Sequence, residues 1–222
     1  MIDLFNFLVD FILHIDKHLL QIVSDYQTWA YLILFAIIFL ETGVVVTPFL
    51  PGDSLIFAAG TIAAMEGHPL NIAWIVPLLI AAAFLGDNTN YFIGKLLGKK
   101  VYEKDFKLIK RKYLDQTHAF YEKHGRITII IARFMPIIRT FAPFVAGVGT
   151  MRYIRFVTFS FLGNIIWVTL FSFAGYFFGN IPFIKNNFSI AILAVIFVSL
   201  LPMIIAGVKQ FNENRGKRRS SQ

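Results

Sequence analysis

The amino-acid sequence predicts an all-α polytopic membrane protein, built from two inverted repeats that each contain a re-entrant helical hairpin and transmembrane helices. Hydrophobic residues make up 57% of the 222 positions and aromatic residues 16%, which is typical of integral membrane proteins. From position 26 to position 65 the charged side chains are Glu41 and Asp53. A helix rises about 1.5 Å per residue, so this run is too long for one crossing of a roughly 30 Å hydrocarbon layer. The chain is therefore expected to turn round inside the membrane.

The first elements follow from where the apolar runs are interrupted. Residues 1–25 mix apolar side chains with acidic and basic ones, which predicts an amphipathic helix at the membrane interface. The first span follows and carries Glu41. A re-entrant hairpin is expected at about 48–65, where Asp53 would N-cap the second helix. The residues that stop the helix or permit an unusual backbone there are Pro48, Pro51 and Gly52.

The second half contains another expected hairpin. Basic residues gather in 99–126 and in 210–222, and the positive-inside rule places this loop and this tail in the cytoplasm. Both stay inside only if the segment 127–150 enters and leaves on the cytoplasmic side. This segment carries Arg133 and Arg139. The residues expected to shape it are Pro136, which with Pro143 would break a straight helix, and Gly147.

Two hairpins from opposite faces imply an inverted repeat within a single membrane domain at 26–209. Tyr91-Phe-Ile-Gly94 and Tyr176-Phe-Phe-Gly179 are a faint trace of that repeat. The Gly-x-x-x-Gly pairs Gly94/Gly98 and Gly175/Gly179 would let helices approach closely, and a homo-oligomer through these faces is a further prediction. Transporters often build their substrate site where such repeats meet at the bilayer midplane.

Three polar residues in the spans are secondary candidates for lining the same cavity. Asp87 and Asn88 interrupt the crossing at about 67–94, and Asn164 lies in a later span. Hydrogen bonds between helices would explain Asp87 and Asn88 about as well, and packing would explain Asn164 better.

Ordered motifs in the chain resemble the DedA family of bacterial membrane proteins, whose domain is also called the VTT or SNARE-associated domain. The motifs are Glu41-Thr-Gly-x-x-x-x-Pro-x-x-Pro-Gly-Asp53, Phe120-Tyr-x-x-His124-Gly125, Arg133-Phe-x-Pro-x-x-Arg139-x-x-x-Pro-x-x-Ala-Gly147 and Gly163-Asn164-x-x-Trp167. The resemblance implies opposed re-entrant hairpins, a multi-pass location in the bacterial inner membrane, and kinship with eukaryotic lipid scramblases. It also implies translocation of undecaprenyl phosphate or another phospholipid in support of envelope and membrane-potential homeostasis. It maps the functional acids onto Glu41 and Asp53 and the functional arginines onto Arg133 and Arg139.

The chemistry of these four residues can be argued independently. A charge at the bilayer centre costs about 2.5–3.5 kcal/mol even on insertion scales, so buried charges persist only when paired or hydrated. Arg133 and Arg139 would present guanidinium forks to a lipid phosphate, and the two acids would compete for them. Glu41 is the expected proton-responsive acid, since a helix dipole favours the charged form of Asp53. Two purely architectural salt bridges are the alternative.

The remaining observations narrow the function. The net charge of +8 is carried by basic residues beside apolar runs, where they set topology, so no nucleic-acid partner is expected. The chain contains no cysteine, and no nucleophile, base or metal-ligand spacing predicts an enzyme, a metal site or a cofactor. The expected partners are lipids with phosphate headgroups and protons. A proton-coupled transporter of a small ion or solute remains the alternative function.

Overall fold

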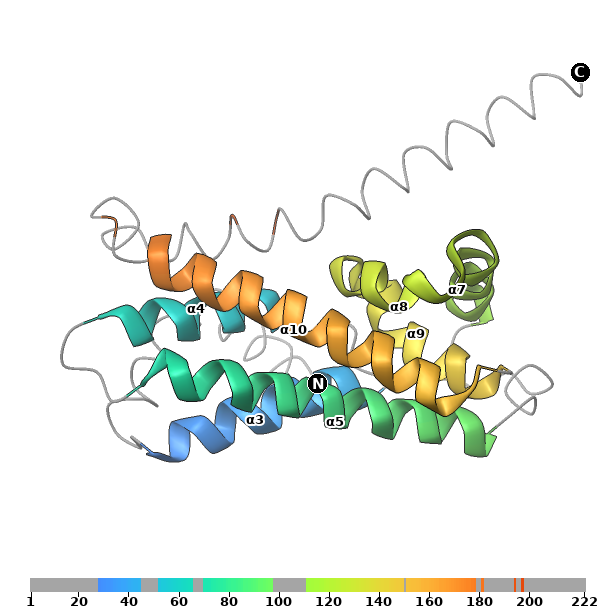
Figure 1. Cartoon of the computed structure of the whole chain (residues 1–222), viewed down its shortest axis with the longest axis horizontal. Helices are drawn as coiled ribbons and strands as arrows, with labels where there is room; N and C mark the ends of the chain where they lie inside the picture. The colour runs from blue at the N-terminus through green and yellow to red at the C-terminus, as the bar shows by residue number, and fades with distance from the viewer. Residues whose placement is uncertain are drawn as a thin grey trace, which may run out of the picture.

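The computed structural model describes residues 28–44, 52–65, 70–97, 111–149 and 151–178, together with the single positions 181, 194 and 197. Every regular element in the described ranges is helical, which confirms the all-α prediction there (Figure 1). The elements are α3 (Thr28–Gly43), α4 (Gly52–Ala64), α5 (Ile72–Leu97), α7 (Arg111–His124), the short 3₁₀ turn η1 (Gly125–Ile127), α8 (Thr128–Ile131), the 3₁₀ turn η2 (Ala132–Phe134), α9 (Pro136–Val148) and α10 (Tyr153–Phe178).

Two long helices, α5 and α10, run along the long axis of the molecule (Figure 1). Each has 26 residues, so each is about 39 Å long and can cross a bilayer. The helices α3, α4 and α9 are apolar but shorter. The expected first span is represented by α3, which has 16 residues.

The shorter helix α4 begins two residues earlier than the sequence indicates, since an N-cap at Asp53 implies a first helical residue at Ser54. It spans Gly52–Ala64, so Asp53 lies within the first helical turn. The N-cap role expected for Asp53 is therefore wrong. Gly52 can lie this close to Glu41 because it has no side chain: a Cβ at this position would overlap the carboxylate of Glu41. The carboxylate of Asp53 bonds to side chains of other helices instead of to the backbone of α4.

The segment 127–150 is a broken helix, as expected, but the break lies at one proline and not at both. Met135 has an extended backbone (φ −127°, ψ 101°), and Pro136 opens α9 at its first turn. The helix then continues through Pro143 to Val148, so the expectation that Pro143 also breaks it is wrong. Proline suits the first turn of a helix because its missing N–H has no intrahelical partner there. Further along, Pro143 removes one hydrogen bond, and the contacts of α9 with α5 and α7 hold the helix together.

Part of the expected cytoplasmic loop is the helix α7. Its buried Leu114 packs against α9, and the Tyr121 hydroxyl donates a hydrogen bond of 2.9 Å to the carbonyl oxygen of Ala142. Several predictions lie outside the described residues. They concern the helix at 1–25, the tail at 210–222, and the residues Pro48, Pro51, Gly98 and Gly179.

Glycines let each shorter helix touch the backbone of a long one. Where α4 packs on α10, a Cβ on Gly60 would overlap the carbonyl of Ser172, and one on Gly175 would overlap the carbonyl of Phe57. The packing of α9 on α5 has the same form, with Gly147 against Tyr91 and Gly94 against Phe144. Gly94 and Gly175 thus serve contacts inside the chain, and an oligomer through their faces stays a prediction.

These contacts predict which glycines tolerate a methyl group. Gly94→Ala and Gly175→Ala should each destabilise the protein by about 1–3 kcal/mol, because the backbones must separate. In Gly163→Ala the added Cβ would meet its nearest atom, the Cα of Ile130, at an ordinary 3.4 Å, so this control should melt near the wild-type temperature. Thermal melting in detergent tests the difference, and equal melting of all three variants would contradict it.

Candidate functional site: a buried charge cluster

Five charged side chains from five elements are buried in the interior. Glu41 lies in the last turn of α3, Asp53 in the first turn of α4, Asp87 on α5, Arg133 on η2 and Arg139 on α9. Their exposed fractions lie between 1% and 7%. Charges this deeply buried are stable only with partners, so the pairing among them decides what the site can do.

Arg139 divides its guanidinium fork between two acids. Its Nη1 donates to Oδ1 of Asp53 at 2.6 Å, and its Nη2 donates to Oε1 of Glu41. The guanidinium also lies over the ring of Trp167, 4.9 Å from the centroid, while the indole Nε1 donates to Asp53 at 2.8 Å. Arg139 is thereby held by two carboxylates and an aromatic face, and it joins α3, α4, α9 and α10.

Arg133 pairs with a different acid, Asp87. Its Nη2 contacts Oδ2 of Asp87. The same oxygen accepts hydrogen bonds from Ser160 Oγ at 2.5 Å and from Asn164 Nδ2 at 3.0 Å. Asp87 is therefore the carboxylate that balances Arg133, and α10 contributes two neutral donors that fix its position.

The cluster contains one more acid than the two acids and two arginines that the sequence indicates. With Asp87 included, three carboxylates face two guanidinium groups. Full ionisation would leave one negative charge in excess in a buried site. One proton on a carboxylate would bring the cluster to neutrality, so its arrangement is suited to binding or releasing a proton.

Several buried polar atoms of the cluster have unused hydrogen-bonding capacity. Glu41 Oε2, Asp87 Oδ1 and Arg133 Nη1 have no hydrogen-bond partner among the residues that the structure describes. A buried guanidinium nitrogen without an acceptor is costly, and a phosphate oxygen is an acceptor that it would bind strongly. Among the described residues the site thus has one unused donor for an anion, Arg133 Nη1, and two acid oxygens that can take a proton.

Two other buried asparagines on α5, the candidate Asn88 and its near neighbour Asn90, have separate roles. Asn88 accepts a hydrogen bond of 2.8 Å from the Tyr153 hydroxyl and donates to the Phe84 carbonyl, so it links α5 to α10 away from the ion pairs. Asn90 donates to the carbonyls of Thr42 and Thr140 at 3.1 and 2.8 Å and ties α5 to α3 and α9. Helix association accounts for both.

The sequence pattern did not single out Ser160 or the indole of Trp167, and it gave Asp87 and Asn164 only a secondary place. The spacing of the three α10 residues carried a usable signal, because positions 160, 164 and 167 lie on one face of a helix and all bear hydrogen-bond donors in an apolar span. Within the described ranges, no three His, Asp or Glu side chains are grouped as a metal site requires.

The fold and the site together define a helical protein with two helices of membrane-crossing length and a buried ionic cluster between its helices. Comparison with known proteins gives the family. The model of the VTT domain matches residues 50–177. The chain therefore belongs to the VTT-domain family, also called the DedA family, and is a membrane protein.

Relatives resemble the chain over most of its length. It is 54% identical over 204 residues to "Protein DedA" of Escherichia coli (strain K12), which covers 91% of this chain and 93% of the relative. It is 43% identical over 185 residues to an uncharacterized membrane protein of Mycobacterium tuberculosis (strain ATCC 25618 / H37Rv), covering 83% and 81%. "Inner membrane protein YghB" of Escherichia coli (strain K12) is 31% identical over 179 residues, covering 80% and 78%. No solved structure matches the chain significantly.

Proposed function

We propose that this protein moves a phosphate-bearing lipid, such as undecaprenyl phosphate or a phospholipid, across the membrane and couples the movement to protons. The observation that carries the proposal is the divided fork of Arg139, which contacts Glu41 and Asp53 at once. Two oxygens of a tetrahedral phosphate can accept hydrogen bonds from a guanidinium fork, as the two oxygens of a carboxylate do. A lipid phosphate can therefore take the place of one of the two acids.

Exchange of Glu41 for phosphate on Arg139 couples phosphate binding to proton uptake. When phosphate displaces Glu41 from Arg139, the freed carboxylate is buried without a cation and takes up a proton. Asp53 keeps its contacts with Arg139 and Trp167, so it anchors the arginine. Arg133 stays with Asp87 and offers its partnerless Nη1 as a second donor to the phosphate. Return of Glu41 to Arg139 then releases both the phosphate and the proton.

We also propose how the helices are arranged as repeats in the membrane. The matched glycine contacts, in which α4 packs on α10 as α9 packs on α5, support two inverted repeats with re-entrant hairpins within one membrane domain at 26–209. The cluster would lie where the repeats meet, as substrate sites of many transporters do. We also infer a multi-pass location in the bacterial inner membrane, supported by the name of the relative YghB.

Reconstitution into liposomes tests the function. The liposomes would contain phosphatidylcholine and a trace of fluorescent polyprenyl phosphate, fluorescent polyprenol or fluorescent phosphatidylethanolamine. Outward movement of each label is measured by an impermeant quencher. We expect movement of lipids that bear phosphate and none of polyprenol. Equal movement of polyprenol would contradict phosphate recognition. Proton-driven flux of inorganic phosphate without any lipid movement would favour the alternative, a transporter of a small ion.

A further inference from the structure

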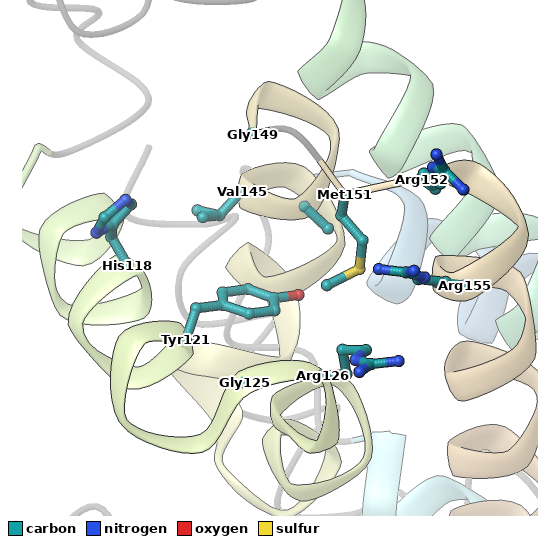
Figure 2. Close-up of a pocket in the computed structure, with 10 residues that line it drawn as sticks. His118, Tyr121, Gly125, Arg126, Val145, Gly149, Met151, Arg152 and Arg155 are labelled. Atoms are coloured by element: carbon teal, nitrogen blue, oxygen red, sulfur yellow. The ribbon is translucent and has the colours of Figure 1, made fainter.

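A second basic site lies outside the buried cluster. A pocket of about 340 Å³ opens between α7, α9 and the start of α10. Figure 2 shows Arg126, Arg152 and Arg155 gathered on one side of the pocket, with His118 on the opposite side and the Tyr121 hydroxyl directed between them. The volume lies within the range of small-ligand sites.

Basic side chains dominate the described lining of this pocket. Among the described residues that line it, three are arginines and none is aspartate or glutamate. None of the three arginines belongs to an ion pair within the described ranges, whereas both arginines of the buried cluster do. Burial raises the pKa of the Tyr121 phenol, so this side chain adds no negative charge at neutral pH. Within the described ranges the three arginines therefore have no carboxylate partner, and the one acid in an ion pair with a lining residue is Glu122, which contacts His118 at 3.7 Å.

The walls of the pocket are not uniformly polar. Val145 and Ala146 are buried in α9, and Met151 is half-buried beside them. The first turn of α10 also begins beside the arginines, and its helix dipole favours an anion there. A ligand that fits has a compact anionic head and can rest an apolar portion on these side chains.

We propose that this pocket binds a phosphate monoester group, carried by a lipid or as free phosphate. A monoester carries nearly two negative charges at neutral pH and offers three acceptor oxygens, which suits several guanidinium donors better than a carboxylate or a singly charged phosphodiester does. The binding does not depend on transport. Its role as a first docking position for the transported lipid rests on the proposed function.

The position of the pocket supports that role. Val145 lies six residues after Arg139 on α9, which corresponds to about 9 Å along the helix axis. The Tyr121 hydroxyl donates to the Ala142 carbonyl between these two positions. The single helix α9, which α7 contacts, therefore connects this pocket with the buried cluster. A headgroup held in the pocket would lie outside the ion pairs, about 9 Å along α9 from Arg139.

Binding of radiolabelled farnesyl phosphate to the purified full-length protein in detergent tests the pocket. The test variant is the double substitution Arg126→Gln with Arg155→Gln. The matched control is Lys95→Gln with Lys123→Gln, which removes two exposed charges outside the pocket. Unlabelled farnesyl phosphate, farnesol and inorganic phosphate serve as competitors. Repeating the series with Arg139→Lys separates the pocket from the buried cluster.

We expect the pocket variant to bind farnesyl phosphate about tenfold more weakly than the lysine control, also in the Arg139→Lys protein. Farnesol should not compete. Competition by inorganic phosphate at concentrations similar to farnesyl phosphate identifies free phosphate as the ligand, and competition only at much higher concentrations identifies the lipid. Unchanged affinity in the pocket variant, or an equal loss in the lysine control, overturns the proposal. A pocket that binds phosphate in a protein that moves no lipid leaves the site standing and refutes the proposed function alone.

Discussion

Arg139→Ala is expected to destabilise the protein by about 3–5 kcal/mol and to abolish lipid movement. The substitution leaves Glu41 and Asp53 without the guanidinium that both contact, and it removes the cation from the face of Trp167. Two like charges would then face each other in a buried site. Melting temperature in detergent and lipid movement in liposomes measure the two effects. Acidification should recover part of the stability, because protonated carboxyl groups need no cation.

Two further variants separate shape from charge at this position. Arg139→Lys keeps the positive charge but cannot reach both acids with a planar fork, so it should melt closer to wild type than the alanine variant while lipid movement is lost. Lys123→Ala removes an exposed cation from α7 and should change neither property. Full lipid movement by Arg139→Lys would mean that charge balance alone suffices and that fork-shaped phosphate recognition is wrong.

Glu41→Gln and Asp87→Asn are expected to have opposite consequences although each removes one negative charge. In Glu41→Gln, Arg139 retains Asp53 and the cluster becomes electrically neutral. This variant should melt near the wild-type temperature, bind lipid and lose the dependence of transport on a pH step. In Asp87→Asn, Arg133 loses the only carboxylate that it contacts in the described structure, so a loss of about 3–5 kcal/mol is expected.

Comparing these two variants shows whether the carboxylate of Glu41 takes part in proton coupling or only holds the helices together through an ion pair. Measuring both variants in parallel, by melting in detergent and by lipid movement with and without a pH step, keeps fold and function apart. A Glu41→Gln protein that melts as low as Asp87→Asn would show that Glu41 only holds the helices together. Unchanged pH dependence in a stable Glu41→Gln protein would remove this residue from the coupling mechanism.

The sequence was sufficient to find most of the charged site but not to pair its members. Glu41, Asp53, Arg133 and Arg139 stood out because a charge in an apolar run needs an explanation. Their pairing depends on which faces of α3, α5 and α9 turn toward one another, and no local pattern specifies that rotation. Asp87 was therefore given a secondary place, although it is the partner of Arg133.

In the broken helices, too, the sequence indicated the features that depend on local residues but not those that depend on contacts between helices. Proline and glycine predicted that the chain breaks near Gly52 and Pro136. The helices α4 and α9 begin at these two residues. The start of α4 was misplaced by two residues, because Gly52 fits against the carboxylate of Glu41, a contact with another helix. Pro143 was expected to end a helix that tertiary packing carries past it.

Competition between phosphate and Glu41 for Arg139 is tested most directly by counting protons. The measurement uses farnesyl phosphate and the purified protein in weakly buffered detergent at pH 8, where the phosphate is already fully ionised. The protein also carries Arg126→Gln and Arg155→Gln, so that phosphate binding in the pocket between α7, α9 and α10 does not contribute to the proton count. We predict uptake of about one proton per bound phosphate in this protein and none when Glu41→Gln is added. Phosphate binding without proton uptake, or with the same uptake after Glu41→Gln, would contradict the exchange.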